Sequence, residues 1–201
     1  MGRPPGPTRY SEERKLQILR FVEDLLVDGT FRDTTMDAVA ERMGMAKSTL
    51  YHYFPKKDDL LYALFDETLT KLITAYRRRL DMDMPPSQQI YECMCDVMEL
   101  TALSPGRARV LYEHKRTLAP EQVEKLTGME REYFELISDS IAKGIAAGEL
   151  RPMEPVMAAH AVTAMVAHSR YWYSPDGPLA PREVAYQFWR IFMDGARSTE
   201  S

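Results

Sequence analysis

The stretch TTMDAVAERMGMAKSTLYHYFPKKDDL, residues 34–60, contains two short helical patterns that lie on either side of Gly44. Apolar positions of the first pattern, Val39 and Met43, can meet Leu50 of the second around the turn. Glycine tolerates the positive φ that a sharp turn between two helices requires of one residue. Two short helices joined in this way form a helix-turn-helix motif, and the sequence therefore predicts one here.

The ends of the two helical patterns carry signals of their own. Thr34 and Asp37 have the spacing of a capping box at the start of the first helix. Pro55 ends the second helix, because proline lacks the backbone N–H that a helix interior needs. We therefore expect the first helix to end before Gly44 and the second to span about residues 47–54.

The second helix presents a polar face once Leu50 is buried. Small side chains at its start let a helix approach the major groove of DNA, where N-terminal residues reach the base edges. Further along, Tyr51 and His52 can donate hydrogen bonds to phosphate oxygens, and so can Lys57. These features favour a DNA-contacting surface, and a merely solvated helix face is the alternative interpretation.

The stretch TTMDAVAERMGMAKSTLYHYFPKKDDLL resembles the signature of TetR-family transcriptional regulators, above all in LYHYF and the lysine pair that follows. The resemblance is specific over about residues 10–62, and over the rest of the chain it lies in helix number and length. At Ala46 the family often has serine or threonine, so a side-chain cap of about 1 kcal/mol is missing. The resemblance implies DNA contacts at Thr35, Lys47, Ser48, Thr49, Tyr51, His52 and Lys57.

The remainder of the chain is also helical in pattern. Proline, glycine and serine separate the segments and no convincing run alternates with period two, so we expect an all-α fold of about nine helices. The clearest break is MDMPPS, residues 82–87. We assign residues 1–57 to an N-terminal arm and a three-helix helix-turn-helix DNA-binding domain, and residues 58–201 to a larger helical effector-binding and dimerisation domain. The predicted helices cover residues 12–27, 36–43, 47–54, 56–80, 88–103, 106–118, 120–147, 155–173 and 181–196.

Composition and charge are those of an ordinary globular chain with a basic N-terminal part. Hydrophobic residues make up 45% of the 201 residues, enough for a substantial core. No apolar run approaches the ~20 residues that span a bilayer, and MGRPPGPTRY lacks the apolar segment of a secretory signal, so we expect a cytoplasmic protein. Residues 1–57 carry a net charge of +2 and the rest −6, which favours a polyanion contact in the N-terminal part.

Metal, disulfide and catalytic motifs do not emerge from the sequence. Cys93 and Cys95 would point about 200° apart on a helix, so they can neither form a disulfide nor share a metal ion. We therefore expect no metal and no cofactor. An all-α enzyme or small-molecule-binding protein without DNA binding is the competing hypothesis, but only isolated groups such as His114 near Glu113 could serve catalysis. A module that binds protein partners is a further alternative.

The last two predicted helices have the composition of an interface between two copies of the chain. Alanines recur through residues 155–173, so another helix could approach closely. Residues 181–196 offer more apolar surface than one helix face needs, namely Val184, Phe188, Trp189, Ile191 and Phe192. A four-helix bundle built from two copies would bury both segments. The TetR resemblance also implies a homodimer through these helices, and burial within one chain is the alternative.

A pocket for a small-molecule effector is expected among the middle helices. Methionines adapt to irregular ligands, while Tyr, His and Trp add groups that orient a ligand. Ordinary core packing is the alternative for each of these residues taken singly. The candidates are Met94, Met98, Leu111, Tyr112, Tyr133, Ile137, Met165, His168 and Trp172.

The segment HSRYWYSPDGPLAPREVAYQFWRIFMDG resembles a TetR branch that includes regulators of fatty-acid and steroid breakdown. Several members of that branch respond to acyl-CoA thioesters, so the resemblance implies an amphipathic effector with an anionic end. Arg170 or the pair Lys115-Arg116 could meet that end. An uncharged hydrophobic ligand would suit the same pocket residues.

Taken together, the sequence predicts a dimeric transcriptional repressor that binds a palindromic operator in double-stranded DNA. Each copy would place residues 47–52 in one major groove. A bound effector would favour a conformation whose two DNA-binding parts are wrongly spaced, and so release the operator. The helix over residues 56–80 would connect the two functions, because it joins the DNA-binding part to the rest.

Overall fold

The structure is a computed structural model that describes residues 9–27, 34–103 and 113–196. Its regular elements in these ranges are helices, which confirms the predicted all-α fold. Two short 3-10 helices, η2 and η3, cover Lys115–Thr117 and His168–Tyr171. The α-helices are α1 (Arg9–Val27), α2 (Met36–Arg42), α3 (Lys47–Tyr53), α4 (Lys57–Asp81), α5 (Pro86–Leu103), α7 (Pro120–Ala146), α8 (Pro155–Ala167) and α9 (Pro181–Ala196).

Two predicted helices differ from the structure. Of the helix expected over residues 106–118, residues 106–112 lie outside the described residues, residues 113–114 are α-helical, and residues 115–117 form the 3-10 helix η2. The helix expected over residues 155–173 is α-helical only to Ala167. The Ser169 hydroxyl donates to the Val166 carbonyl at 2.6 Å, and such a local bond competes with the α-helical pattern. The chain accordingly tightens into η3 before the loop that leads to α9.

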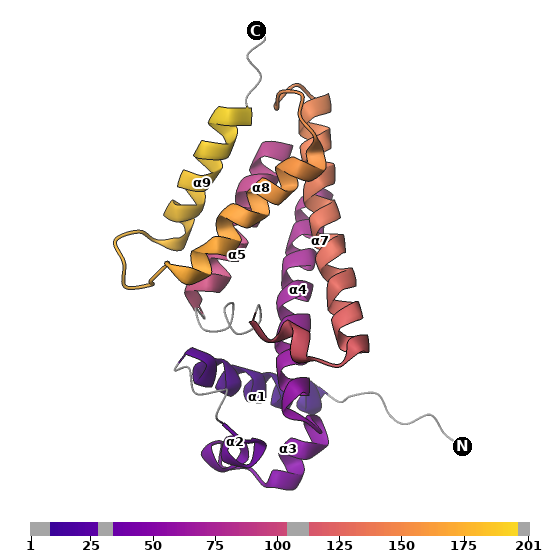
Figure 1. The fold of residues 1–201 in the computed structure, drawn as a ribbon, viewed down its shortest axis with the longest axis vertical. Helices are drawn as coiled ribbons and strands as arrows, with labels where there is room; N and C mark the ends of the chain where they lie inside the picture. Colours follow the sequence, from indigo (N-terminus) through magenta and orange to yellow (C-terminus); the bar gives the residue numbers. More distant parts are fainter. Residues whose placement is uncertain (1–8, 28–33, 104–112, 197–201) are drawn as a thin grey trace, which may run out of the picture.

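The molecule has two parts that α4 connects (Figure 1). We call helices α1–α3 the head and helices α5, α7, α8 and α9 the body. The 25-residue helix α4 starts beside α3 and runs into the body, where it packs extensively on α7. Helix α5 lies between α4 and α9 and contacts both. The position of the head relative to the body therefore depends on α4.

Each part has its own hydrophobic core, and α4 belongs to both. Leu60, Leu64 and Phe65 of α4 are buried in the head core with residues of α1, α2 and α3. Further along the same helix, Leu72 and Tyr76 are buried in the body core. Because both cores hold the same helix, a movement of α4 in the body would be passed on to the head.

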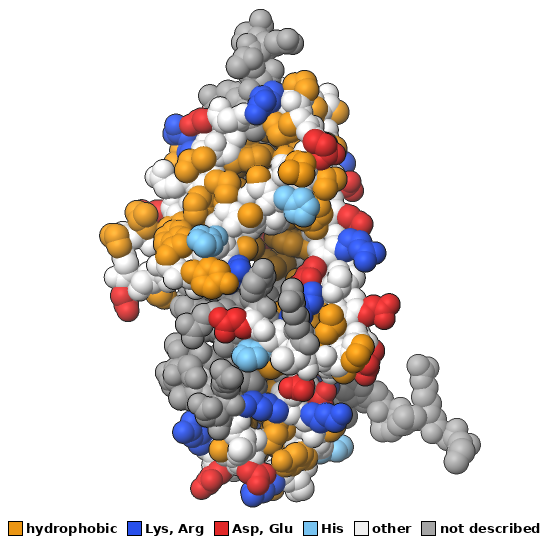
Figure 2. All heavy atoms as spheres, viewed as in Figure 1, with side chains coloured by type: hydrophobic (Ala, Val, Ile, Leu, Met, Phe, Trp, Pro, Cys, Tyr) orange, Lys and Arg blue, Asp and Glu red, His pale blue; other side chains and the backbone are white. Residues whose placement is uncertain are grey.

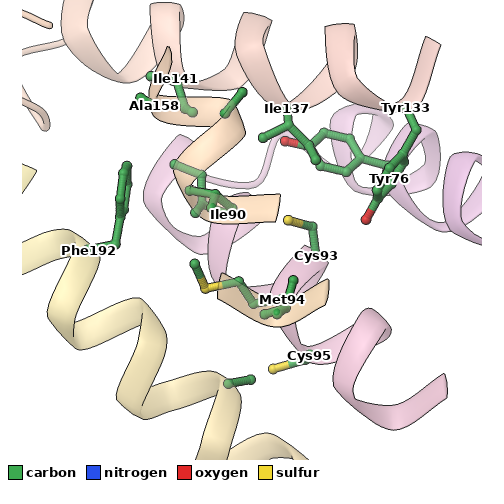
Figure 3. Packing of buried hydrophobic residues seen from close by; sticks show 14 of the residues in the cluster. Tyr76, Ile90, Cys93, Met94, Cys95, Tyr133, Ile137, Ile141, Ala158 and Phe192 are labelled. Atoms are coloured by element: carbon green, nitrogen blue, oxygen red, sulfur yellow. The ribbon is translucent and has the colours of Figure 1, made fainter. Parts of the chain in front are cut away.

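Helix α7 adds a second connection between the parts. Leu118 and Leu126, which flank its first turns, are buried in the head core, whereas Ile137 and Ile141 lie in the body core (Figure 3). Gln122 donates from Nε2 to Oδ1 of Asp59 in α4 at 2.9 Å. Among the described helices, none combines the length and the apolar character needed to cross a membrane.

Candidate nucleic-acid interface

Local hydrogen bonds form the helix-turn-helix around Gly44. The Thr35 hydroxyl caps α2 by accepting from the Ala38 N–H at 3.2 Å. After α2, the Met45 N–H donates to the Ala40 carbonyl at 2.9 Å and closes the turn. Gly44 has φ +61°, which confirms the positive φ that the sequence predicted for this residue.

Helix α3 is held against the head core by one side only. Leu50 is fully buried and Phe54, just after the helix, is 4% exposed. On the α2 side they meet Val39 and Ala40, which are also buried. With seven residues, α3 has no second apolar side that needs a partner. The rest of its surface therefore points away from the head core.

The residues predicted to contact DNA occupy that surface. Lys47, Ser48, Thr49, Tyr51 and His52 are all exposed on α3. Thr35 is exposed at the start of α2, and Lys57 is half-buried at the start of α4. Ala46 precedes α3 without a side-chain hydrogen bond to it, as the sequence predicted. The seven positions thus lie at the starts of α2 and α4 and along the outer face of α3.

Asp37 has a role that the sequence analysis missed. Thr35 rather than Thr34 is the N-cap of α2, so the predicted capping box of Thr34 with Asp37 is wrong. The Asp37 carboxylate instead reaches α3, where its Oδ2 lies 2.6 Å from Lys47 Nζ and its Oδ1 accepts from the Tyr51 hydroxyl at 3.4 Å. Only the folded turn brings α2 and α3 together, so sequence spacing alone gave no signal for this contact.

The electrostatics of this cluster follow from the same contacts. The hydrogen bond from Lys47 holds the pKa of the Asp37 carboxyl below its ordinary value. The bond to Asp37 in turn raises the pKa of the Lys47 ammonium. Both groups are therefore charged at neutral pH, and the exposed start of α3 carries an ion pair rather than an isolated lysine.

The start of α4, next to α3, is fixed to the body by polar contacts. The Asp59 carboxylate accepts from the Lys56 N–H at 2.9 Å and from Gln122 Nε2 of α7 at 2.9 Å. Further along the two helices, Lys125 Nζ lies 3.2 Å from an Asp66 carboxylate oxygen. These contacts connect the DNA-facing end of α4 with the first turns of α7.

The described structure brings four of the predicted effector residues together and places three others apart from them. Met94, Met98 and Ile137 are fully buried and Tyr133 is 8% exposed, all within the body core (Figure 3). Met165 and His168 lie outside the buried core. Met165 is half-buried on α8, and His168 is exposed at the start of η3. Trp172 is 51% exposed. Leu111 and Tyr112 lie outside the described residues.

Two of the three groups predicted to meet an anionic effector, Lys115 and Arg170, already have protein partners. Lys115 forms an ion pair with Glu130. The Arg170 guanidinium donates to the Ala167 carbonyl and lies over the Tyr171 ring, 4.5 Å from its centre. The side chain of Arg116 is outside the described residues.

The body core contains a polar cluster that sequence analysis did not find. Both terminal nitrogens of Arg79 in α4 donate to the Asp96 carboxylate of α5, each at 2.6 Å. Nearby, the buried hydroxyls of Tyr76 and Tyr133 make no well-formed hydrogen bond among the described residues, although Ser140 is a polar neighbour of Tyr76 and Cys93 of Tyr133. Burial raises the pKa of both phenols, and it raises the pKa of the Cys93 thiol to about 12. Buried donors without a partner are rare in proteins.

Metal and thiol chemistry find no support in the described part of the chain. Cys93 and Cys95 are buried free thiols of α5. No group of three or more His, Cys, Asp or Glu residues within residues 9–27, 34–103 and 113–196 is placed to hold a metal ion.

A helix-turn-helix whose second helix is exposed, joined through α4 to an all-α body, defines a DNA-binding regulator of the helix-turn-helix class. The sequence family described as "Bacterial regulatory proteins, tetR family" matches residues 18–64. The family described as "Tetracyclin repressor-like, C-terminal domain" matches residues 83–196. The chain therefore belongs to the TetR family of transcriptional regulators, which are not enzymes, and the competing enzyme hypothesis is wrong.

Individual relatives agree with this assignment over nearly the whole chain. The uncharacterized HTH-type transcriptional regulator YhgD of Bacillus subtilis (strain 168) is 26% identical over 182 residues, 87% of this chain and 92% of YhgD. The HTH-type transcriptional repressor KstR2 of Mycolicibacterium smegmatis is 23% identical over 201 residues, 98% of this chain and 97% of KstR2. The crystal structure of AibR in complex with isovaleryl coenzyme A and operator DNA has a TM-score of 0.76 at 22% identity and covers 89% of this chain and 97% of AibR.

Proposed function

We propose that this regulator is a dimeric repressor that places α3 in the major groove of a palindromic operator and leaves DNA when a small molecule binds. The exposed outer face of α3 is the observation that carries the proposal. Base edges would be read from Lys47 and Thr49, and phosphates would be bound by Tyr51, His52 and Lys57. Residues 1–57 would form the DNA-binding domain and residues 58–201 the effector-binding and dimerisation domain, acting in the cytoplasm where the operator is.

An exposed apolar surface on α8, the loop after η3 and α9 supports the dimer. Large apolar side chains gather over α8 and beside it (Figure 2). Monomeric proteins rarely expose an apolar surface of this kind without a partner for it. The exposed large apolar side chains of this region are Val156, Met157, Tyr171 in η3, Trp172, Leu179 and Ile191. The exposed Tyr186 lies instead on the other side of α9, beside Tyr91 of α5.

The structure changes which α9 residues would form that dimer. Val184 and Phe192, expected from the sequence at the interface, are buried in the body core of the same chain, and Phe188 packs partly against it. Ile191 is 64% exposed and Met157 is 66% exposed, and both border a groove of about 370 Å³ between α8 and α9. The dimer proposal therefore rests on Ile191 and Met157.

The dimer is tested by adding a charge on that surface. An uncompensated charge at an apolar interface is costly, so Ile191→Asp should convert the dimer to a monomer that stays folded and binds a palindrome weakly. Thr127→Asp, which adds the same charge at an exposed position of α7, should remain dimeric. Light scattering at micromolar concentration measures both, and a wild-type monomer would contradict the proposal.

We further propose that the effector is an amphipathic metabolite such as an acyl-CoA, bound among α4, α5, α7 and α8. The bound ligand named for AibR and the likeness of residues 168–195 to acyl-CoA-responsive regulators support this class. The hydroxyls of Tyr76 and Tyr133, which make no well-formed hydrogen bond among the described residues, support a polar ligand group near Arg79, because a carbonyl oxygen could accept from them. The proposed pocket residues remain Met94, Met98, Leu111, Tyr112, Tyr133, Ile137, Met165, His168 and Trp172.

Helix α4 offers a route from that site to DNA. A ligand that separates α4 from α5 or α7 would shift the part of α4 that lies in the head core. Only a ligand with different affinities for the two conformations shifts their populations, and couplings of about 1–3 kcal/mol are typical. The same ligand must then bind the DNA-bound protein more weakly than the free protein, by the same factor.

A single DNA-binding experiment tests both parts of the proposed function. Fluorescence anisotropy with DNA from upstream of the protein's own gene should show tight binding, and competitor DNA of scrambled sequence should not displace it. Isovaleryl-CoA and longer thioesters, their free acids and their methyl esters are then titrated against the complex. Release by thioesters alone supports the acyl-CoA class, and release by methyl esters alone contradicts it. If no DNA is bound in preference to the scrambled competitor, the regulator proposal itself fails.

A further inference from the structure

The contact between Asp37 and α3 places an acidic group at the surface proposed to meet DNA. Asp37 lies in the first turn of α2, and its carboxylate contacts Lys47 and Tyr51 on consecutive turns of α3. The side chains of Asp37 and Lys47 are 49% and 63% exposed. The ion pair therefore faces the same solvent-filled side as the proposed DNA contacts.

Folding stability gains little from a carboxylate at this position, because its interaction with the positive end of α2 and an exposed ion pair are both weak in water. Exposed ion pairs contribute little, because water screens them and two flexible side chains must be ordered. Thr35 already caps α2, so Asp37 is not needed for that purpose. Near phosphates an extra negative charge is unfavourable. The larger effect of this carboxylate is therefore expected on the binding of DNA.

The chemistry of the two partners indicates what this effect would be. The Lys47 ammonium has three protons, so it can keep its bond to Asp37 and still donate to one DNA acceptor. The Tyr51 hydroxyl has one proton, so it can donate either to Asp37 or to a DNA phosphate, but not to both at once. Asp37 thus fixes the direction of Lys47 and competes with phosphate for the Tyr51 proton.

We propose that Asp37 is a specificity-determining residue, which holds Lys47 and Tyr51 so that they bind one arrangement of DNA groups and contact mismatched DNA poorly. In non-specific complexes the carboxylate repels phosphates and neutralises Lys47, which would otherwise bind any phosphate. In the operator complex, Lys47 remains bonded to Asp37 and donates to a matching acceptor. The inference rests on the proposed DNA contacts of Lys47 and Tyr51.

The test substitutes Asp37→Asn and measures binding to the operator and to a scrambled duplex of equal length over a range of KCl concentrations. Freed from the carboxylate, Lys47 should bind one more phosphate in non-specific complexes. Affinity for scrambled DNA should rise about threefold to tenfold, with a plot of log K against log[KCl] steeper by about 0.9. Operator affinity should change less, so the ratio of operator to scrambled affinity should fall.

Asp24→Asn is the matched control, because it removes the same charge from an exposed position of α1. It should leave the affinity ratio and the salt slope as in the wild type. In the Lys47→Met background, Asp37→Asn should raise affinity for scrambled DNA less than in the wild type, because only the repulsion between the carboxylate and phosphates is then removed. If Asp37→Asn leaves the ratio unchanged, or weakens binding to both duplexes equally as a structural residue would, the inference is overturned.

Two further variants separate this inference from the proposed function. Lys47→Met and Tyr51→Phe should each weaken operator binding. If neither does, the proposed DNA contacts are wrong and the inference fails with them. If both weaken binding and Asp37→Asn leaves the ratio unchanged, the DNA-binding proposal stands and only the role of Asp37 is wrong.

Discussion

The head and the body differ in where their predicted functional residues lie. On α3 of the head, the residues predicted to touch DNA are exposed along one face, while Leu50 on the other side is buried. In the body, four of the predicted effector residues, including Met94 and Ile137, are instead buried in the core (Figure 3). A surface that reads DNA consists of side chains that stay exposed. In a short amphipathic helix, the pattern of polar and apolar residues already indicates which side chains these are. A pocket consists of space between helices, which no single helix specifies.

Breaking the ion pair between Arg79 and Asp96 in the body core should have the largest effect on the free energy of unfolding. Arg79→Met leaves the Asp96 carboxylate in a poorly solvated place without its partner, so the free energy of unfolding should fall by about 3–5 kcal/mol. Urea denaturation measures this. The double variant Arg79→Met/Asp96→Asn should lose clearly less than the sum of the single changes, and additive losses would contradict a coupled pair.

The head core should respond almost as strongly. Leu50→Ala removes a fully buried side chain that attaches α3 to α2 and α4, and such changes cost about 2–5 kcal/mol. DNA binding should be lost because α3 is no longer held. The exposed apolar surface around Ile191 belongs to the body, so the oligomeric state by light scattering should stay as in the wild type. A loss of the oligomer together with DNA binding would show that head and body do not behave separately.

Exposed residues of α3 should affect DNA binding without affecting folding. Tyr51→Ala and His52→Ala should weaken operator binding about tenfold each, with unchanged thermal unfolding, because both side chains are exposed. Replacing a residue that binds phosphate should lower the affinity for operator and scrambled DNA by a similar factor. Replacing Thr49, which would contact a base edge, by alanine should instead lower the affinity for the operator selectively. Wild-type affinity in both the Tyr51 and the His52 variants would remove them from the interface.

The smallest expected effect is a gain at the start of α3. Ala46 precedes the helix with extended backbone and no side-chain cap. Serine there can accept from an N–H of the first turn, so Ala46→Ser should stabilise the protein by about 0.5–1 kcal/mol in thermal unfolding. Ala46→Gly, which also lacks a side-chain acceptor, is the control and should gain less than the serine variant. Equal stability of the two variants would show that the serine hydroxyl forms no cap on α3, so that a cap at this position does not stabilise the head.

Several features followed from the sequence because their causes are local. Gly44 marks the turn since few other residues accept positive φ, and Pro55 stops α3 since proline cannot continue a helix. Leu50 is apolar and its neighbours on α3 are mostly polar, so the position of Leu50 determines which side of α3 is buried. The predicted bounds of α9 match the structure for the same reason, because proline begins the helix and its apolar positions recur with the helical period.

Other features depend on which helices meet, and only the tertiary structure decided them. The sequence put Asp37 in a capping box, but the packing of α2 on α3 directs its carboxylate to Lys47 instead. Arg79 and Asp96 form a pair because α4 and α5 lie side by side. Val184 and Phe192 were expected between two copies of the chain, yet they are needed for its own core. Periodicity states that a helix face is apolar, and the three-dimensional arrangement of helices decides what that face covers.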